Sequence, residues 1–150
     1  MTLRHYLEIR FDGRTFLIPN APDLLIEPRE NMQDEPRGTA AATRVVQGAV
    51  WPAYALDADL KARLDAPWTR AVFLNSTAAR PVGLLVEDLK LLPVDSLRIE
   101  PFTPLGPSPK TGRHLFDAAA MQPGGLTLVF ATAGLISRLQ NEEDAHGLAG

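Results

Sequence analysis

The stretch YLEIRFDGRTFLIP, residues 6–19, alternates apolar and polar side chains up to an Asp12-Gly13 pair and is apolar again from Phe16. Before that pair, one face of an extended chain would carry Leu7, Ile9 and Phe11. Asp-Gly tolerates the positive φ that a two-residue hairpin turn demands, and Phe16 and Ile18 resume the apolar pattern after it. Residues Leu7–Pro19 are therefore predicted to form a β-hairpin.

Similar short extended segments recur along the rest of the chain. Residues 24–26 are expected to be a short buried strand or a turn of helix, and strands are expected at residues 44–56, 68–74, 82–86, 115–121 and 126–130. The last two are predicted to form a hairpin around a Pro-Gly-Gly turn, and residues 68–86 another. Short strands separated by turn signals indicate an all-β barrel or sandwich rather than a βαβ sheet.

Two short helices are expected in addition to the strands. Asp57 is a good N-cap, Leu60 and Leu64 lie four apart, and Ala66-Pro67 would end the helix. A second short helix is predicted to close the fold, on the spacing of Leu135, Ile136 and Leu139.

Three segments lack apolar periodicity. Residues 29–43 are predicted to be a long polar surface loop, and residues 93–112, with five prolines, an extended connection. The acidic residues 140–150 are expected to be a disordered tail. The sequence thus predicts one domain, residues 1–139, followed by that tail.

Composition excludes several classes of protein. A formal charge of −3 with scattered Arg does not provide the clustered basic surface that nucleic acid or anionic lipid requires. The absence of Cys excludes disulfides, thiolate metal sites and cysteine nucleophiles. Because no signal-peptide pattern opens the chain and no apolar run reaches a membrane span, we expect a cytoplasmic protein without membrane insertion.

No group of residues with a catalytic or metal-binding spacing is present. His5, His114 and His146 are widely separated, and alternation sends Glu87 and Asp88 to opposite faces of a strand. The sequence contains no nucleophile elbow, phosphate-binding loop or dinucleotide fingerprint. We expect no catalytic residue, no metal and no cofactor, and therefore a protein that is not an enzyme.

Aromatic residues leave a second function open. Trp51, Tyr54 and Trp68 are candidates for the core, for a protein interface or for the lining of a ligand site. A small-molecule-binding β-barrel with these three side chains at its mouth is therefore the alternative to a protein-binding module.

Four segments, in this order, resemble the CheW-like domains of chemotaxis adaptors. Residues 6–19 are similar to the family's opening hairpin, and residues 24–28 (LLIEP) to its next strand. Residues 45–56 (VVQGAVWPAYAL) and 80–89 (RPVGLLVEDL) resemble two later strands, and residues 126–139 lie where such domains close. The resemblance covers nearly the whole chain, from Tyr6 to Leu139.

The resemblance implies two small five-stranded β-barrels on a shared core. It also implies a non-enzymatic scaffold in chemotaxis-type signalling that binds a histidine kinase regulatory domain, a chemoreceptor tip or another CheW-like domain. By position, it implies protein contacts at Ile26, Glu27, Gly48, Val50 and Val86. The family's N-L-R-G turn is missing, since only three residues separate Gly48 from Pro52, so a shortened or absent middle hairpin is expected.

Overall fold

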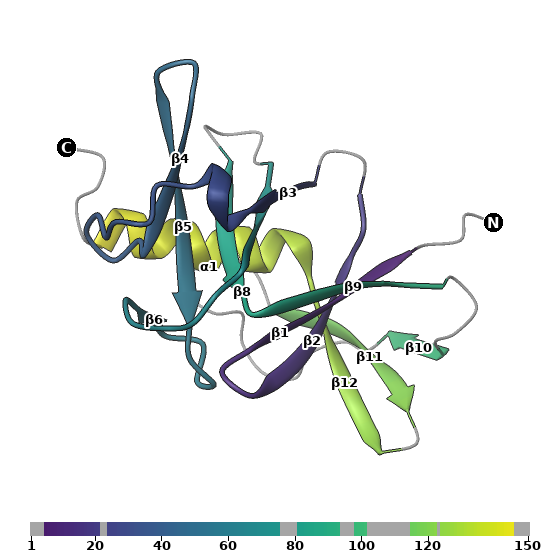
Figure 1. Ribbon diagram of the computed structural model, residues 1–150. Coiled ribbons are helices and arrows are strands. Elements are labelled where there is room, and N and C mark those ends of the chain that lie inside the picture. The colour runs from purple at the N-terminus through teal and green to yellow at the C-terminus, as the bar shows by residue number, and fades with distance from the viewer. Residues whose placement is uncertain are drawn as a thin grey trace.

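The computed structural model describes residues 5–21, 24–75, 81–93, 98–101, 115–122 and 124–145. Within these ranges the chain forms two antiparallel-rich sheets and a single α-helix (Figure 1). The all-β prediction is confirmed, with one helix in place of the two expected.

Sheet A is built from both ends of the chain, in the order β10-β11-β12-β2-β1-β9. Its strands are β1 (Tyr6–Phe11), β2 (Arg14–Pro19), β9 (Asp88–Leu92), β10 (Arg98–Pro101), β11 (Phe116–Gln122) and β12 (Gly125–Phe130). Strand β12 runs parallel to β2, with Val129 opposite Leu17. This parallel contact joins the C-terminal hairpin to the N-terminal one.

The predicted hairpin at residues 6–19 is confirmed. Phe11 lies opposite Arg14, and the two residues between them have positive φ, 47° at Asp12 and 74° at Gly13. Such angles are typical of the two-residue turns that match the twist of paired strands. The hairpin at residues 116–130 is also confirmed, with Gln122 opposite Gly125. Strands β9 and β10 were not predicted from the sequence.

Sheet B is formed by the segment between β2 and β9, in the order β3-β7-β8-β5-β4. Its strands are β3 (Leu25–Pro28), β4 (Ala42–Val46), β5 (Ala49–Leu56), β7 (Arg70–Leu74) and β8 (Val82–Val86), and the two-residue β6 (Ala62–Arg63) pairs with β5. The predicted hairpin of β7 and β8 is confirmed, and β5 runs parallel to β8.

Residues 44–56 form a hairpin rather than one extended stretch. Gln47 and Gly48, with φ of 51° and 82°, make a two-residue turn between β4 and β5. Thr43, opposite Pro52, exchanges both of its backbone hydrogen bonds with Gln33 on the outer side of β4. The Thr43–Pro52 position therefore needs no ladder bond, and proline is tolerated there. Of the two alternatives expected, a shortened or an absent middle hairpin, the absent one is wrong, since this hairpin projects from the body of the molecule (Figure 1).

The helix predicted from Asp57 to Ala66 is absent. Instead, one carboxylate oxygen of Asp57 accepts hydrogen bonds from the backbone N–H groups of Asp59 and Lys61, at 2.9 and 3.0 Å. Leu60 adopts a positive φ of 64°, which a helix does not allow. Asp57 therefore caps a turn into β6, because Asp satisfies backbone donors in turns as well as at helix starts.

The predicted surface loop at residues 29–43 is only partly a surface loop. It opens with a 3-10 turn at Arg29–Asn31 and pairs Gln33 with Thr43, and it buries Met32, Ala40 and Ala41. Met32 and Ala41 pack in the cluster on the outer face of sheet B, and Ala40 packs in the cluster between the sheets.

Helix α1 (Thr132–Ala145) closes the chain and is longer than predicted. Its buried residues Leu135 and Leu139 pack into the core. Residues 140–145, expected to begin a disordered tail, are helical, and residues 146–150 lie outside the described part of the chain.

The largest hydrophobic cluster lies between the two sheets. Sheet A contributes Phe16, whose ring centroid is 5.0–5.7 Å from those of Phe11, Phe116 and Phe130. Sheet B contributes Tyr54 and neighbouring aliphatic residues, and α1 covers one side. Two smaller clusters lie on the opposite faces of the sheets, one around Leu17 and Val129 in sheet A and one around Phe73 in sheet B.

A polar contact joins the two sheets at the tip of the first hairpin. The backbone N–H of Asp12 donates to Glu87 Oε2 at 2.7 Å, and the N–H of Ala58 donates to Asp12 Oδ2 at 2.6 Å. Arg63 also forms an ion pair with Asp12, at 3.2 Å. This turn therefore has a structural role in addition to reversing the chain.

Candidate functional site

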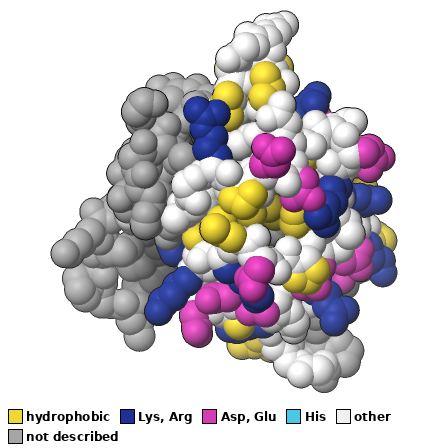
Figure 2. All heavy atoms as spheres, turned by 60° about the vertical axis from the view of Figure 1, so that its left-hand side comes forward, with side chains coloured by type: hydrophobic (Ala, Val, Ile, Leu, Met, Phe, Trp, Pro, Cys, Tyr) yellow, Lys and Arg dark blue, Asp and Glu magenta, His cyan; other side chains and the backbone are white. Residues whose placement is uncertain are grey.

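Three of the seven exposed large hydrophobic side chains of the described residues lie on the edge strands of sheet B. Leu25 is 40% exposed and Ile26 37% in β3, and Val45 is 41% exposed in β4. Figure 2 shows hydrophobic side chains in the middle of this face and on the hairpin above them, with acidic and basic side chains around them. Exposed apolar groups that are contiguous and rimmed by polar ones are typical of interaction sites.

An ion pair brings the two edges of sheet B together. Glu27 in β3 and Arg44 in β4 lie on opposite edge strands, yet Arg44 Nε is 3.8 Å from Glu27 Oε2. Asn31 Nδ2 donates to the same carboxylate oxygen at 2.9 Å, and Arg44 Nη1 donates to the Asn31 carbonyl oxygen at 2.9 Å. Sheet B is therefore curled, and Ile26 and Val45 are the chain neighbours of the two paired residues, with side chains on the opposite face of their strands. We call Leu25, Ile26, Val45 and Val50 the β3–β4 seam.

Alternation along the strands gives the seam two faces. Val45 lies opposite Val50 across the β4–β5 hairpin, and Arg44 lies opposite Trp51 on the other face. In β3, Leu25 lies opposite Phe73, whereas Ile26 lies opposite Val72. Leu25 of the seam therefore lies on the face that carries Phe73, whereas Ile26, Val45 and Val50 lie on the opposite face.

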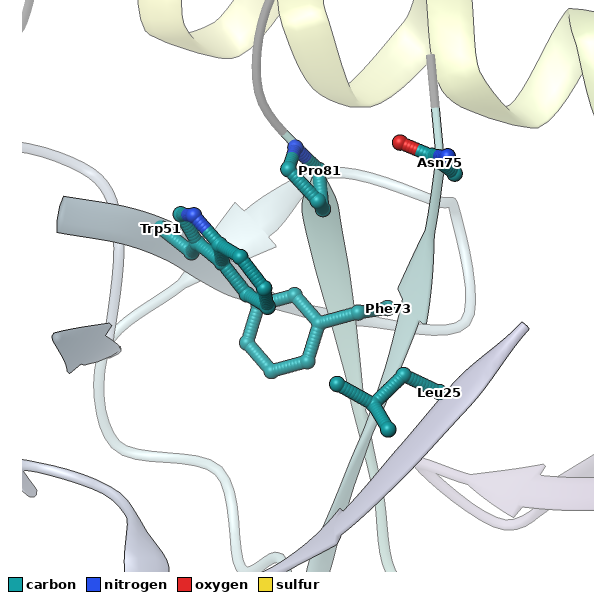
Figure 3. Close-up of a pocket in the computed structure, with 5 residues that line it drawn as sticks. All are labelled: Leu25, Trp51, Phe73, Asn75 and Pro81. Atoms are coloured by element: carbon teal, nitrogen blue, oxygen red, sulfur yellow. The ribbon is translucent and has the colours of Figure 1, made fainter. Parts of the chain in front are cut away.

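A hollow of about 320 Å³ opens on that second face. It is lined by Leu25, Trp51, Phe73, Asn75 and Pro81, which come from β3, β5, β7 and the start of β8 (Figure 3). Trp51 and Phe73 meet edge to face, with ring centroids 5.6 Å apart and planes at 63°. Asn75 supplies the polar side chain of the lining. We call it the Trp51–Phe73 hollow.

Gly83 in β8 lies directly against Phe73, one of the residues that line the hollow. A Cβ atom there would lie 2.8 Å from Cε1 of Phe73 and 2.9 Å from the Cβ of Ala53. The Phe73 ring can lie across β8 only because residue 83 has no side chain.

The structure brings together four of the five contact positions expected from the sequence. Ile26 and Val50 belong to the seam, Glu27 makes its central ion pair, and Gly48 forms the tip of the adjoining hairpin. Val86 is fully buried in the cluster between the sheets, so a partner has no access to its side chain.

The three aromatic residues of the alternative function do not line one common site. Trp51 lines the hollow, but Tyr54 is fully buried between the sheets, on the other face of β5. Trp68 is buried, and the guanidinium of Arg29 lies 4.5 Å from the centroid of its ring. Residues 51 and 54 are three apart in one strand, so alternation alone places them on opposite faces. The sequence was therefore sufficient to exclude a site shared by Trp51 and Tyr54.

Several residues of the site were not identified from the sequence. Leu25, Val45, Phe73 and Pro81 are ordinary apolar residues of strands and strand ends. Only the cross-strand register and the curl of sheet B separate them from buried residues of the same type. The one available signal was Gly83 within an apolar strand, which indicates a close approach of another group.

The described residues contain no group of three or more His, Cys, Asp or Glu side chains that could hold a metal ion. His5 is exposed, and His114 and His146 lie outside the described ranges. The part of the chain that the structure describes contains no helix long and apolar enough to span a bilayer.

Two carboxyl groups near β6 are shifted toward ionisation. Hydrogen bonds from the backbone N–H groups of Lys61 and Asp59 lower the pKa of Asp57. A side-chain hydrogen bond and the charge of Arg63 lower the pKa of Asp65. These groups stabilise a turn, and neither lines the hollow.

Comparison with known proteins gives a likeness in fold. No family model matches the sequence, and no curated protein resembles it in sequence. Among solved structures, the chain is similar to the scaffolding protein TtCheW from Thermoanaerobacter tengcongensis, with a TM-score of 0.53 and 12% identity. The match covers 87% of this chain and 90% of TtCheW. The CheW-like fold expected from the sequence is therefore confirmed.

Proposed function

We propose that this CheW-like domain is a non-enzymatic adaptor in chemotaxis-type signal transduction and acts in the cytoplasm. The observation that carries the proposal is the match to a scaffolding protein over nearly the full length of both chains. The proposed partners are a histidine kinase regulatory domain, a chemoreceptor tip or another CheW-like domain.

The β3–β4 seam is the proposed contact surface. Ile26 and Val45 expose apolar groups beside the edges of sheet B, where unpaired backbone groups can also bind an extended partner segment. The Glu27–Arg44 ion pair holds these two edges in place before any partner binds. A surface that is ordered in advance loses less conformational entropy on binding.

The β4–β5 hairpin would contribute to the same contact. Its two-residue turn at Gln47-Gly48 keeps the hairpin short, and the Val45–Val50 pair gives it an apolar face. This hairpin lacks the N-L-R-G turn of the family, so we expect it to make a smaller contact with a kinase domain than the family's longer hairpin would.

A charge placed in the seam tests the proposal. Ile26→Glu and Val45→Glu would each place a carboxylate in a desolvated contact, and we expect each to weaken binding at least tenfold, as for central interface residues. Binding is measured by calorimetry against the regulatory domain of a chemosensory kinase and a receptor-tip fragment from the same cell.

Leu126→Glu is the matched control, because Leu126 is 63% exposed in β12 of sheet A. It should bind as the unmodified chain does. The adaptor role is rejected if neither partner binds while an established adaptor binds both in parallel. The seam is rejected if the control loses as much affinity as the two seam variants.

A further inference from the structure

We infer that the Trp51–Phe73 hollow is a binding site for a small, uncharged aromatic molecule. This inference does not rest on the adaptor role, although Leu25 belongs both to the hollow and to the β3–β4 seam. It concerns the face of sheet B opposite the cluster between the sheets, whereas the proposed protein contact centres on Ile26, Val45 and Val50.

The walls of the hollow match an aromatic ligand. Trp51 and Phe73 meet at 63°, so they present a ring face and a ring edge to the same space (Figure 3). A third ring placed there can stack on one and meet the other edge to face, the two favourable aromatic geometries. Leu25 and Pro81 provide the remaining apolar contacts.

The polar content of the lining favours an uncharged molecule with one hydrogen-bonding group. Asn75 is the polar residue among the five that line the hollow, and no Lys, Arg, Asp or Glu is among them. Its amide offers one acceptor and one donor group at the rim (Figure 3). A charged ligand would be desolvated without receiving an opposite charge.

The residues beneath the rings keep the space open. Five of the nine buried residues of the cluster on this face are alanines: Ala41, Ala42, Ala53, Ala55 and Ala71. The Phe73 ring lies so close to Gly83 that a Cβ atom there would displace it. The volume of about 320 Å³ is at the lower end for small-molecule sites and suits one or two fused rings.

Indole is the probe for the first experiment. It is titrated into the ¹⁵N-labelled chain, and amide and Trp side-chain N–H shifts are followed by NMR. We expect a dissociation constant on the order of 1 mM, since a fragment of this size gains limited binding energy. The shifts should centre on Leu25, Trp51, Phe73 and Asn75, with the Trp51 side-chain N–H moving and that of Trp68 unchanged.

Two further probes define the ligand class. 1-Methylindole has the same rings without the N–H donor and should bind about threefold to tenfold more weakly, a difference that Asn75→Leu should abolish. Indole-3-acetate, which carries a negative charge, should bind at least tenfold more weakly than indole.

Variants complete the test. Trp51→Leu removes one aromatic wall and should weaken indole binding at least tenfold, with its NMR spectrum reporting that the fold is retained. Leu64→Ala, at a residue that is 49% exposed and does not line the hollow, should bind indole unchanged. The site is rejected if shifts scatter over the surface, if Trp51→Leu binds as well as the unmodified chain, or if indole-3-acetate binds as tightly as indole.

Discussion

The two faces of sheet B are packed in different ways. The face toward sheet A is filled by large side chains, and Ala40 is the one alanine among the buried residues of that cluster. On the opposite face most buried residues are alanines, and the large rings of Trp51 and Phe73 lie toward the hollow. The first face holds the two sheets together, whereas the second leaves space at the surface. One sheet thus provides both a core and a candidate binding site.

The largest expected effect comes from the cluster between the sheets. Phe16→Ala removes a buried ring that packs against three others, so we expect a loss of about 3–5 kcal/mol in the free energy of unfolding. Urea denaturation measures it. Trp51→Ala is the comparison on the opposite face and should cost clearly less, because Trp51 is only half-buried. Equal losses would contradict the difference between the two faces.

A smaller effect is expected at Gly83, which lies against Phe73. Gly83→Ala places a methyl group against the Phe73 ring and Ala53, at a cost of about 1–3 kcal/mol. In the double variant Gly83→Ala with Phe73→Leu, the ring is absent and part of this cost should be recovered. Thermal or urea unfolding of the unmodified chain, the two single variants and the double variant gives the coupling energy between residues 73 and 83. If the losses in the free energy of unfolding of the two single variants simply added in the double variant, the packing of the Phe73 ring would not depend on the missing side chain at Gly83.

The polar contact at the edge of the inter-sheet layer is expected to contribute about 1–2 kcal/mol. Asp12→Gly keeps the positive φ of the turn but removes the carboxylate that binds the N–H of Ala58 and the guanidinium of Arg63. Unfolding should become easier, and amide hydrogens of the turn at residues 57–61 should exchange faster. Unchanged exchange in that turn would show that Asp12 does not join the sheets.

The smallest effect on stability is expected when the pH is lowered. Folding lowers the pKa values of Asp57 and Asp65, so the stability that they add is present above their unfolded pKa, about 3.9. It is lost as the pH falls through the still lower pKa values of the folded chain. Asp57→Asn, which does not titrate, should lose less stability than the unmodified chain between about pH 4 and about pH 2. If the urea midpoints of Asp57→Asn and of the unmodified chain fell by the same amount over this pH range, Asp57 would not contribute to the acid sensitivity.

The local parts of the fold could be predicted from signals that are adjacent in the chain. The hairpins at residues 6–19, 70–86 and 116–130 depend on alternation and turn residues that are adjacent in the chain, so they could be predicted. Asp57 shows the limit of such signals, since the same side chain can cap a helix or a turn. The positive φ of Leu60, which excludes the helix, depends on the pairing of β6 with β5.

The position of the candidate site depends on contacts between segments far apart in the chain. Glu27 and Arg44 meet because sheet B curls until its two edges are close, and no local pattern encodes that contact. Leu25 and Phe73 line a hollow while the equally apolar Val86 is buried, because strand order and register, not hydrophobicity, decide which apolar side chains are covered. Strand pairing between residues far apart in the chain therefore turned common apolar residues into a surface site.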